Sequence, residues 1–410
     1  MTDSSVPSSP DVPVSLDDIR RAGEAIHGSL ERTPLTLSRT LSEITGATVH
    51  LKFENLQYTG SFKGRGARHR LLTVAPGHGV VAMSAGNHAQ GVAHHGALLG
   101  LPTTIVMPEN TPFVKVARTR DLGAEVVLAG ADVEEAAVRA HELADERGLE
   151  FIHPFDDPAV IAGQGTVGLE MLEQEPALDM IVTAVGGGGL AAGLAVAASG
   201  HDRPVEIVGV QTERYPSMAD ELAGRASTAR AGSTVADGIA VTEPGRLTST
   251  ILAEHGVDVL VVPEAAIEQA IAMLLEIEKT VVEGAGAAGL AALMTYPDRF
   301  AGKRVGLVLS GGNIDPRTLS VVTLRGLAVA GRLNRLRVEL DDVPGRLALV
   351  ADLIAREAAN VVEVDHDGLG STGARSTVLE LRIDTLDAEH AERVLEAILA
   401  EGLRAELVDW

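Results

Sequence analysis

Lys63 follows an aromatic residue, Phe62, and stands next to glycines, since residues 61–67 read SFKGRGA. A lysine amine in this setting, at the start of a helix, can act as a nucleophile that forms a Schiff base with a carbonyl compound. A surface lysine is the competing interpretation, because lysine side chains are ordinarily exposed. The segment alone leaves both interpretations open.

Three further segments place polar groups or glycines directly after a predicted strand. Residues 84–91 (SAGNHAQG) bring hydroxyl, amide and backbone N–H groups to a helix N-terminus, which suits a carboxylate. In residues 185–190 (VGGGGL), backbone N–H groups can converge on a phosphate without Cβ clashes, although a flexible turn is the alternative. This run is neither a Walker motif nor a GxGxxG motif. Residues 309–313 (LSGGN) place the Ser310 hydroxyl at a strand end.

Short β-rich runs alternate with helical stretches, which predicts an α/β fold with βαβ units around largely parallel sheets. In open α/β sheets, ligands bind outside the carboxyl ends of the strands, where several of the glycine turns lie. We therefore expect the chemistry in these turns. The predicted strands are 49–53, 80–83, 103–107, 125–128, 181–185, 206–211 and 305–309.

Composition limits the partners that this chain can have. Its 410 residues include 34 Lys and Arg against 57 Asp and Glu, a net charge of −23. This charge repels nucleic acid and anionic membranes, so we expect neither as a partner. The absence of cysteine excludes a thiol nucleophile and suits a cytoplasmic protein. Residues 181–200 are uncharged, but six of them are glycine, which favours a strand, a turn and a buried helix over a membrane span.

Together and in this order, the four segments closely resemble the fold-type II pyridoxal-phosphate (PLP) enzymes, in the threonine ammonia-lyase branch. The resemblance covers residues 17–327 and implies a two-lobed fold like that of the tryptophan synthase β subunit. It also implies that Lys63 holds PLP as a Schiff base, that Phe62 packs beside the cofactor ring, and that Asn87 hydrogen-bonds the phenolic oxygen. Ser310 is expected at the pyridine nitrogen. The expected phosphate loop consists of Gly186, Gly187, Gly188 and Gly189.

The resemblance further implies a substrate site in the second segment. The residues expected around the substrate carboxylate are Ser84, Ala85, Gly86, Asn87 and His88. His88 has a competing role as a packing residue at the helix start. Ala85 lies where related serine racemases have a serine that moves a proton, and a methyl group cannot do so, so we expect weak or absent racemisation. Glu283, in EGAGAAG at 283–289, resembles a residue of the cofactor cleft, with a plain helix-start carboxylate as the alternative.

The implied reaction is the deaminating dehydration of L-threonine to 2-oxobutanoate and ammonia, and of L-serine to pyruvate. Lys63, with its pKa lowered by burial, is expected to remove the Cα proton. A hydroxyl at the pyridine nitrogen moderates the electron sink, which fits β-elimination better than transamination. The alternatives are a serine-preferring dehydratase, a hydroxyaspartate dehydratase and a non-catalytic amino-acid sensor.

From about residue 336 the pattern changes to a βαββαβ unit, an α+β domain. Its turn, DDVPGRL at 341–347, and its topology resemble the ACT regulatory domain, which implies pairing across subunits and an amino-acid effector. A purely structural dimerisation unit is the alternative.

We expect a homodimer or homotetramer. We also expect no metal, since the acidic residues near Glu213 only loosely resemble a cation site of some relatives. The expected division is a disordered tail (1–14), a catalytic domain (15–327) with a smaller lobe of about 58–155 inserted in the larger lobe, a linker (328–335) and the ACT-like domain (336–410).

Overall fold

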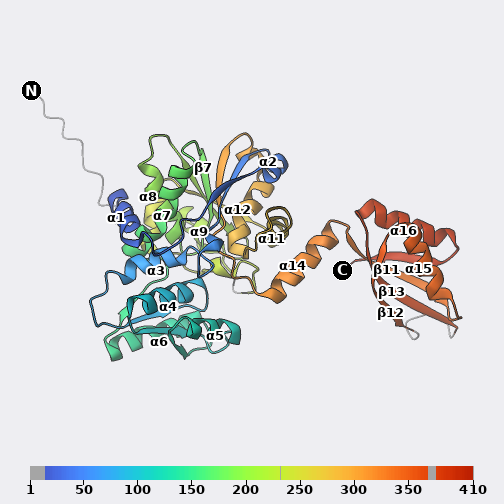
Figure 1. Ribbon diagram of the computed structural model, residues 1–410, viewed down its shortest axis with the longest axis horizontal. Helices are drawn as coiled ribbons and strands as arrows, with labels where there is room; N and C mark the ends of the chain where they lie inside the picture. Colours follow the sequence, from blue (N-terminus) through green and yellow to red (C-terminus); the bar gives the residue numbers. More distant parts are fainter. Residues whose placement is uncertain (1–13, 231, 368–374, 410) are drawn as a thin grey trace, which may run out of the picture. The chain divides into compact units, whose positions relative to one another are not determined.

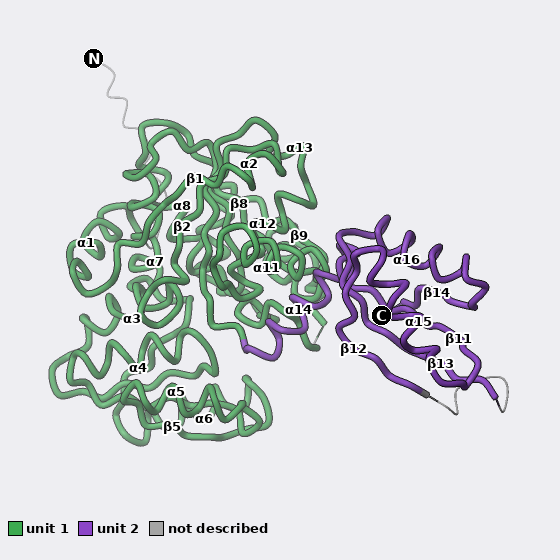
Figure 2. The backbone as a smooth tube through the Cα atoms, turned by 45° about the vertical axis from the view of Figure 1, so that its right-hand side comes forward, with its two compact units in different colours: residues 1–314 green, residues 315–410 purple. Residues whose placement is uncertain are grey.

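The computed structural model describes residues 14–230, 232–367 and 375–409. The chain forms two compact units, Met1–Ile314 and Asp315–Trp410 (Figure 2). Residues 1–13 of the predicted tail lie outside the described residues, whereas Val14 is 1% exposed and belongs to the hydrophobic core. The ordered chain therefore begins no later than Val14, just before Ser15 caps the first helix.

A six-stranded sheet forms the centre of the first unit, in the order β1-β2-β10-β7-β8-β9. Only β1 runs antiparallel to its neighbour. This sheet confirms the predicted α/β class with mainly parallel strands. Its strands are β1 (Leu35–Ser38), β2 (Thr48–Lys52), β7 (Met180–Ala184), β8 (Glu206–Thr212), β9 (Asp258–Val262) and β10 (Arg304–Val308).

A second, four-stranded parallel sheet has the order β5-β4-β3-β6. All of its strands come from the stretch between β2 and β7, together with helices α4 (Asn87–Leu99), α5 (Phe113–Asp121) and α6 (Val133–Arg147). Figure 1 shows these three helices gathered on one side of α3 (Lys63–Leu71). The strands are β3 (Val80–Met83), β4 (Thr103–Met107), β5 (Glu125–Leu128) and β6 (Glu150–Phe151).

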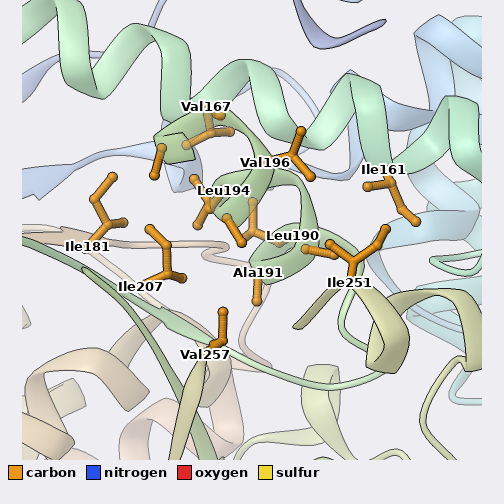
Figure 3. Packing of buried hydrophobic residues seen from close by; sticks show 14 of the residues in the cluster. Ile161, Val167, Ile181, Leu190, Ala191, Leu194, Val196, Ile207, Ile251 and Val257 are labelled. Carbon is orange, nitrogen blue, oxygen red and sulfur yellow. The ribbon is translucent and has the colours of Figure 1, made fainter. Parts of the chain in front are cut away.

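Two helices that are apolar on nearly every face pack together beside the larger sheet, α7 (Pro158–Gln174) and α8 (Gly189–Ser199). They approach closely because both carry glycine at the contact, where a Cβ on Gly193 would lie 2.6 Å from the backbone nitrogen of Gly165. Figure 3 shows Leu190 and Leu194 of α8 between side chains of α7, such as Val167, and side chains of β7 and β8, Ile181 and Ile207. No helix in the described ranges is long and apolar enough to cross a membrane.

The remaining helices of the first unit cover the two sheets or connect their strands. They are α1 (Leu16–Ile26), α2 (Arg39–Thr45), α9 (Ser217–Leu222), α10 (Arg246–Glu254), α11 (Glu264–Glu278), α12 (Gly284–Thr295) and α13 (Pro297–Phe300), with 3-10 turns η1 (Glu54–Leu56) and η2 (Asp237–Ile239).

The second unit contains the predicted βαββαβ domain, whose four strands form an antiparallel sheet in the order β12-β13-β11-β14. One face of this sheet buries its apolar side chains with those of the two helices. The elements are α14 (Pro316–Val329), β11 (Leu333–Asp341), α15 (Arg346–Arg356), β12 (Asn360–Asp367), β13 (Ser376–Asp384), α16 (Ala388–Ala400) and β14 (Arg404–Val408).

The division between the units differs from the predicted boundary at 327 and the predicted linker at 328–335. Helix α14 groups with the second unit, and it starts at Pro316 because Asp315 accepts hydrogen bonds from the first free backbone N–H groups. Residues 328–329 end this helix, and residues 333–335 already pair with β13 as the start of β11. Only residues 330–332 connect the two elements.

Candidate active site

Lys63 is the first residue of α3, a helix that packs against α4 and α7. Its Nζ donates a hydrogen bond to the backbone oxygen of Pro154 at 2.9 Å and lies 5.4 Å from the centre of the Phe62 ring. Burial lowers the pKa of the Lys63 amine to about 8, and the charge of Glu283 opposes this shift. About a tenth of the amine is therefore neutral at pH 7, far more than for an exposed lysine, and the neutral form is the one that a nucleophile or base requires.

The Asn87 side chain is fixed at both of its polar atoms. Its Nδ2 donates to Glu283 at 2.6 Å, and its Oδ1 accepts from Asn313 at 2.7 Å. Asn313 also donates to the backbone oxygen of Thr59. Burial and the nearby charge of Asp237 raise the pKa of the Glu283 carboxyl to about 7. The predicted cofactor residue Asn87 thus lies in a hydrogen-bonded group that includes Glu283.

The four-glycine turn joins β7 to α8 and has room for no side chain. A Cβ on Gly187 would overlap the ring of Phe155, and a Cβ on Gly188 would lie 2.7 Å from Met218 and 2.8 Å from Thr248. Gly188 also has a φ of +94°, a conformation that favours glycine. Because the first N–H groups of α8 have no partner inside the helix, the turn suits an anion such as a phosphate.

The first and fourth sequence segments lie side by side in the structure. The backbone N–H of Phe62 donates to the oxygen of Ser310 at 3.1 Å, and Ser61 forms an isolated β-bridge with Gly311. Ser310 is 2% exposed. The Ser61 hydroxyl is buried and has no hydrogen-bond partner, so a polar group at the site can still be accommodated there.

The predicted substrate segment forms the loop between β3 and α4. The Ser84 hydroxyl accepts a hydrogen bond from the N–H of Gly86, and Ala85 packs against the hydrophobic core of the smaller lobe. His88 is 3% exposed, and its Nε2 lies 3.1 Å from the backbone oxygen of Ile152. Burial lowers the pKa of His88 to about 3, so the ring is neutral. The contact with Ile152 favours the packing role for His88.

Comparison with known proteins agrees with this geometry. The family described as pyridoxal-phosphate dependent enzyme matches residues 26–311. The chain belongs to the pyridoxal-phosphate dependent enzymes. Within this PLP family, it is 42% identical over 400 residues to an L-threonine ammonia-lyase of Thermotoga maritima, which covers 96% of this chain and 100% of that protein. It is 45% identical over 391 residues to an L-threonine ammonia-lyase of Geobacter sulfurreducens, which covers 94% of this chain and 97% of that protein.

Solved structures of PLP enzymes share the fold of the first unit. A threonine deaminase of T.th. is 42% identical with a TM-score of 0.70, and the match covers 73% of this chain and 99% of that chain. A serine racemase from Dictyostelium discoideum is 34% identical with a TM-score of 0.69, and the match covers 74% of this chain and 99% of that chain. The sequence prediction of a fold-type II PLP enzyme of the threonine ammonia-lyase branch is confirmed.

The residues of this PLP enzyme fit the cofactor. The glycine turn presents the first N–H groups of α8, which no side chain caps, the Ser61 hydroxyl is buried without a partner, and the Lys63 amine has a lowered pKa. These are a phosphate cradle, an available polar atom and a nucleophile, which are the groups that PLP requires. The residues that hold each cofactor atom remain a proposal.

Sequence reasoning missed several residues of this site. Pro154, Phe155 and Asp156 lie in the connection from β6 to α7, and Thr248 lies in α10, where no motif marks them. Asn313 ends the fourth segment and could have been assigned a role from that position. In the acidic stretch near Glu213, where no metal was expected, Asp220 accepts hydrogen bonds from Thr228 and pairs with Arg225. Among the described residues, no group of three His, Asp or Glu side chains is arranged to hold a metal ion.

Proposed function

We propose that this chain catalyses the deaminating dehydration of L-threonine to 2-oxobutanoate and ammonia, and of L-serine to pyruvate as a second reaction. The observation that carries the proposal is the Lys63 amine, which has a pKa of about 8 and lies in the same unit as the glycine turn, Asn87 and Ser310. The names of the two nearly full-length relatives support threonine as the substrate.

The proposed cofactor contacts are those that the resemblance to fold-type II PLP enzymes implies for each residue. The glycine turn of Gly186, Gly187, Gly188 and Gly189 at the start of α8 holds the phosphate. Asn87, held by Glu283, bonds the phenolic oxygen, and Ser310 meets the ring nitrogen. Phe62 packs beside the ring. PLP bound in this way supplies the electron sink that makes the Cα proton of an amino acid removable.

Lys63 performs the proton transfers of the reaction. Because its pKa is about 8, the amine is readily neutral and accepts the Cα proton of the bound amino acid. The resulting ammonium group can then donate a proton to the departing β-hydroxyl, which leaves as water. The backbone oxygen of Pro154 accepts a hydrogen bond from the amine and holds it within the site.

The loop from β3 to α4 recognises the substrate carboxylate. Ser84, the backbone of Gly86 and the Asn87 amide lie at the N-terminus of α4, where the helix dipole favours an anion. Ala85 offers no proton donor on this side of the substrate, so we expect elimination of water with weak or absent racemisation of serine.

The proposal is tested by the absorbance spectrum of the chain with PLP and by oxo acid release. L-Threonine, L-serine and threo-3-hydroxyaspartate are compared as substrates. Lys63→Ala should lose both the visible cofactor band and the activity, whereas Lys303→Ala, at an exposed lysine, should keep both. Higher kcat/KM on serine or hydroxyaspartate than on threonine would assign the chain to one of those alternatives. A colourless wild-type chain without activity would support the amino-acid sensor.

The C-terminal unit is proposed to bind an amino-acid effector at the exposed turn before α15 and to take part in a homodimer or homotetramer. In support, the N-cap residue of α15 is Gly345, which has a φ of +94° and provides no side-chain cap, so the first N–H groups of the helix are available to a carboxylate. Isoleucine and valine are the effectors to test. Unchanged kinetics with either amino acid at saturation would contradict regulation, and light scattering measures the subunit number.

A further inference from the structure

Residues 153–156 (HPFD) connect β6 to α7 and contact three parts of the active site. Pro154 accepts the hydrogen bond of the Lys63 amine, Phe155 packs against the glycine turn, and Asp156 contacts the start of α10. The ring nitrogen Nδ1 of His153 accepts the backbone N–H of Asp156 at 2.7 Å, which fixes the shape of the segment. One short connection therefore positions both the amine and the proposed phosphate loop.

Asp156 supplies the cap of α10 from a distant part of the chain. The residue at the N-cap position, Gly245, has no side chain to bond the first N–H groups. Oδ1 of Asp156 accepts these bonds instead, from Leu247 at 2.9 Å and from Thr248 at 3.1 Å. A cap of this kind fixes where the helix begins and how its first turn is oriented.

Thr248, which Asp156 holds in place, in turn binds the glycine turn. It is 0% exposed, and its Oγ1 lies 2.5 Å from the oxygen of Gly187 and 3.0 Å from that of Gly245. The Phe155 ring fills the space beside the Gly187 Cα where a Cβ would be. Because a trans peptide points its C=O and N–H in opposite directions, fixing the Gly187 oxygen also fixes the direction of the Gly188 N–H.

We propose that Asp156 and Thr248 are positioning residues that hold the glycine turn in its phosphate-binding conformation. The inference rests on the proposed function, in which this turn holds the PLP phosphate. Four consecutive glycines have more backbone conformational freedom to lose when a ligand binds than any other four residues. The hydrogen bond from Thr248 removes part of this freedom before the cofactor arrives, which strengthens binding by preorganisation.

Replacing Thr248 tests this role directly. Thr248→Val keeps the shape and removes the hydroxyl. The Gly187 oxygen then keeps only the longer bond of 3.3 Å from the backbone N–H of Gly245, and we expect the dissociation constant for PLP to rise about tenfold or more. Thr250→Val is the matched control, because Thr250 lies on the same helix and its exposed hydroxyl bonds only the oxygen of Arg246. It should bind PLP within about twofold of wild type, and Thr248→Ser should restore most of the affinity.

A pair of neighbouring aspartates separates positioning from plain stability. Asp156→Ala should weaken PLP binding. Asp157→Ala removes the cap of α7 and an ion pair with Arg70, so it should lower the melting temperature and leave the affinity for PLP unchanged. Equal losses of affinity in the two variants, or an unchanged affinity in both Thr248→Val and Asp156→Ala, would overturn the proposal.

Hydrogen exchange in the cofactor-free chain tests the contact independently of PLP binding. Thr248→Val should speed amide exchange in residues 186–189 severalfold, and Thr250→Val should not. Unchanged exchange would refute the role of Thr248 even if PLP binds elsewhere. Suppose that the wild-type chain binds no PLP, while amide exchange in the turn still speeds up in Thr248→Val. This result would contradict the proposed cofactor site and also the binding role proposed for the turn.

Discussion

A group of buried charged side chains close to Lys63 in the sequence gives the largest stability effect that we predict. Arg65, two residues after Lys63, is 1% exposed and donates two hydrogen bonds of 2.8 Å to Glu54, which is 0% exposed. Arg65 also donates to Glu170, which in addition accepts a bond from the buried Lys52. Two positive and two negative side chains therefore balance one another inside the unit.

Glu54→Gln keeps the shape of the side chain and removes its charge. One of the two bonds to Arg65 then becomes a contact between two donors, and the group retains one uncompensated positive charge. Removing one partner of a buried ion pair costs about 3–5 kcal/mol, so we expect a loss of this size in the free energy of unfolding. Glu173→Gln is the control, because Glu173 pairs with Arg32 at the surface, where a pair contributes about 0–1 kcal/mol.

Urea unfolding of the catalytic unit, followed by circular dichroism, measures both variants. A loss below about 1 kcal/mol in Glu54→Gln, no greater than the control, would refute the argument from buried charge. Burial raises the pKa of Glu54, but Arg65 and Lys52 outweigh it and hold the pKa below 4.5. The charge of Glu54 therefore stabilises the fold above that pH and ceases to do so as the pH falls through the folded-state pKa. The difference between wild type and variant should shrink below about pH 4.5.

Three further predictions concern the active site and the core. Burial and Asp237 raise the pKa of Glu283 from 4.5 to about 7, so wild type should lose up to about 3 kcal/mol of stability relative to Glu283→Gln as the pH rises between these values. Parallel pH curves would contradict this. The rate at which the chain takes up PLP should rise with pH up to about 8, the pKa of Lys63, and a flat profile from pH 6 to 9 would contradict the lowered pKa. In thermal melts, Gly193→Ala should destabilise the chain by about 1–3 kcal/mol, because the added methyl group overpacks the contact between α7 and α8. Gly23→Ala, at an open helical position, should instead stabilise the chain by about 0.5–1 kcal/mol. Equal effects of the two substitutions would refute the close packing of α7 and α8.

Local sequence patterns were sufficient to predict several strands around the candidate active site and the loops that follow them. The strands 80–83, 103–107 and 125–128 match the structure residue for residue, because each is a short β-rich run between clear turn signals. The glycine turn and the 84–91 loop follow strands as predicted. β6 escaped prediction because it has only two residues, and β9 has an apolar run, DVLVV, that the same reasoning could have found.

Long-range contacts could not be predicted in the same way. Asp156 caps a helix that begins 90 residues later, and Glu283 bonds an amide 196 residues earlier in the chain. In sequence, Asp156 reads as an ordinary acidic residue near a helix start, and for Glu283 only the family resemblance indicated a place in the cofactor cleft. Their roles depend on which elements fold against one another, and a single sequence carries no record of that.

The opposite shifts of Lys63 and Glu283 suit a site that receives a charged substrate. Burial disfavours charge on both groups, and it brings their pKa values to about 8 and about 7. With the pKa values one unit apart, the ion pair and the uncharged pair differ by only about 1.4 kcal/mol. An incoming amino-acid carboxylate raises the pKa of Glu283 further, because like charges repel. In the proposed binding mode the carboxyl is then protonated, and the site receives the substrate carboxylate beside Asn87 without placing a second negative charge against it.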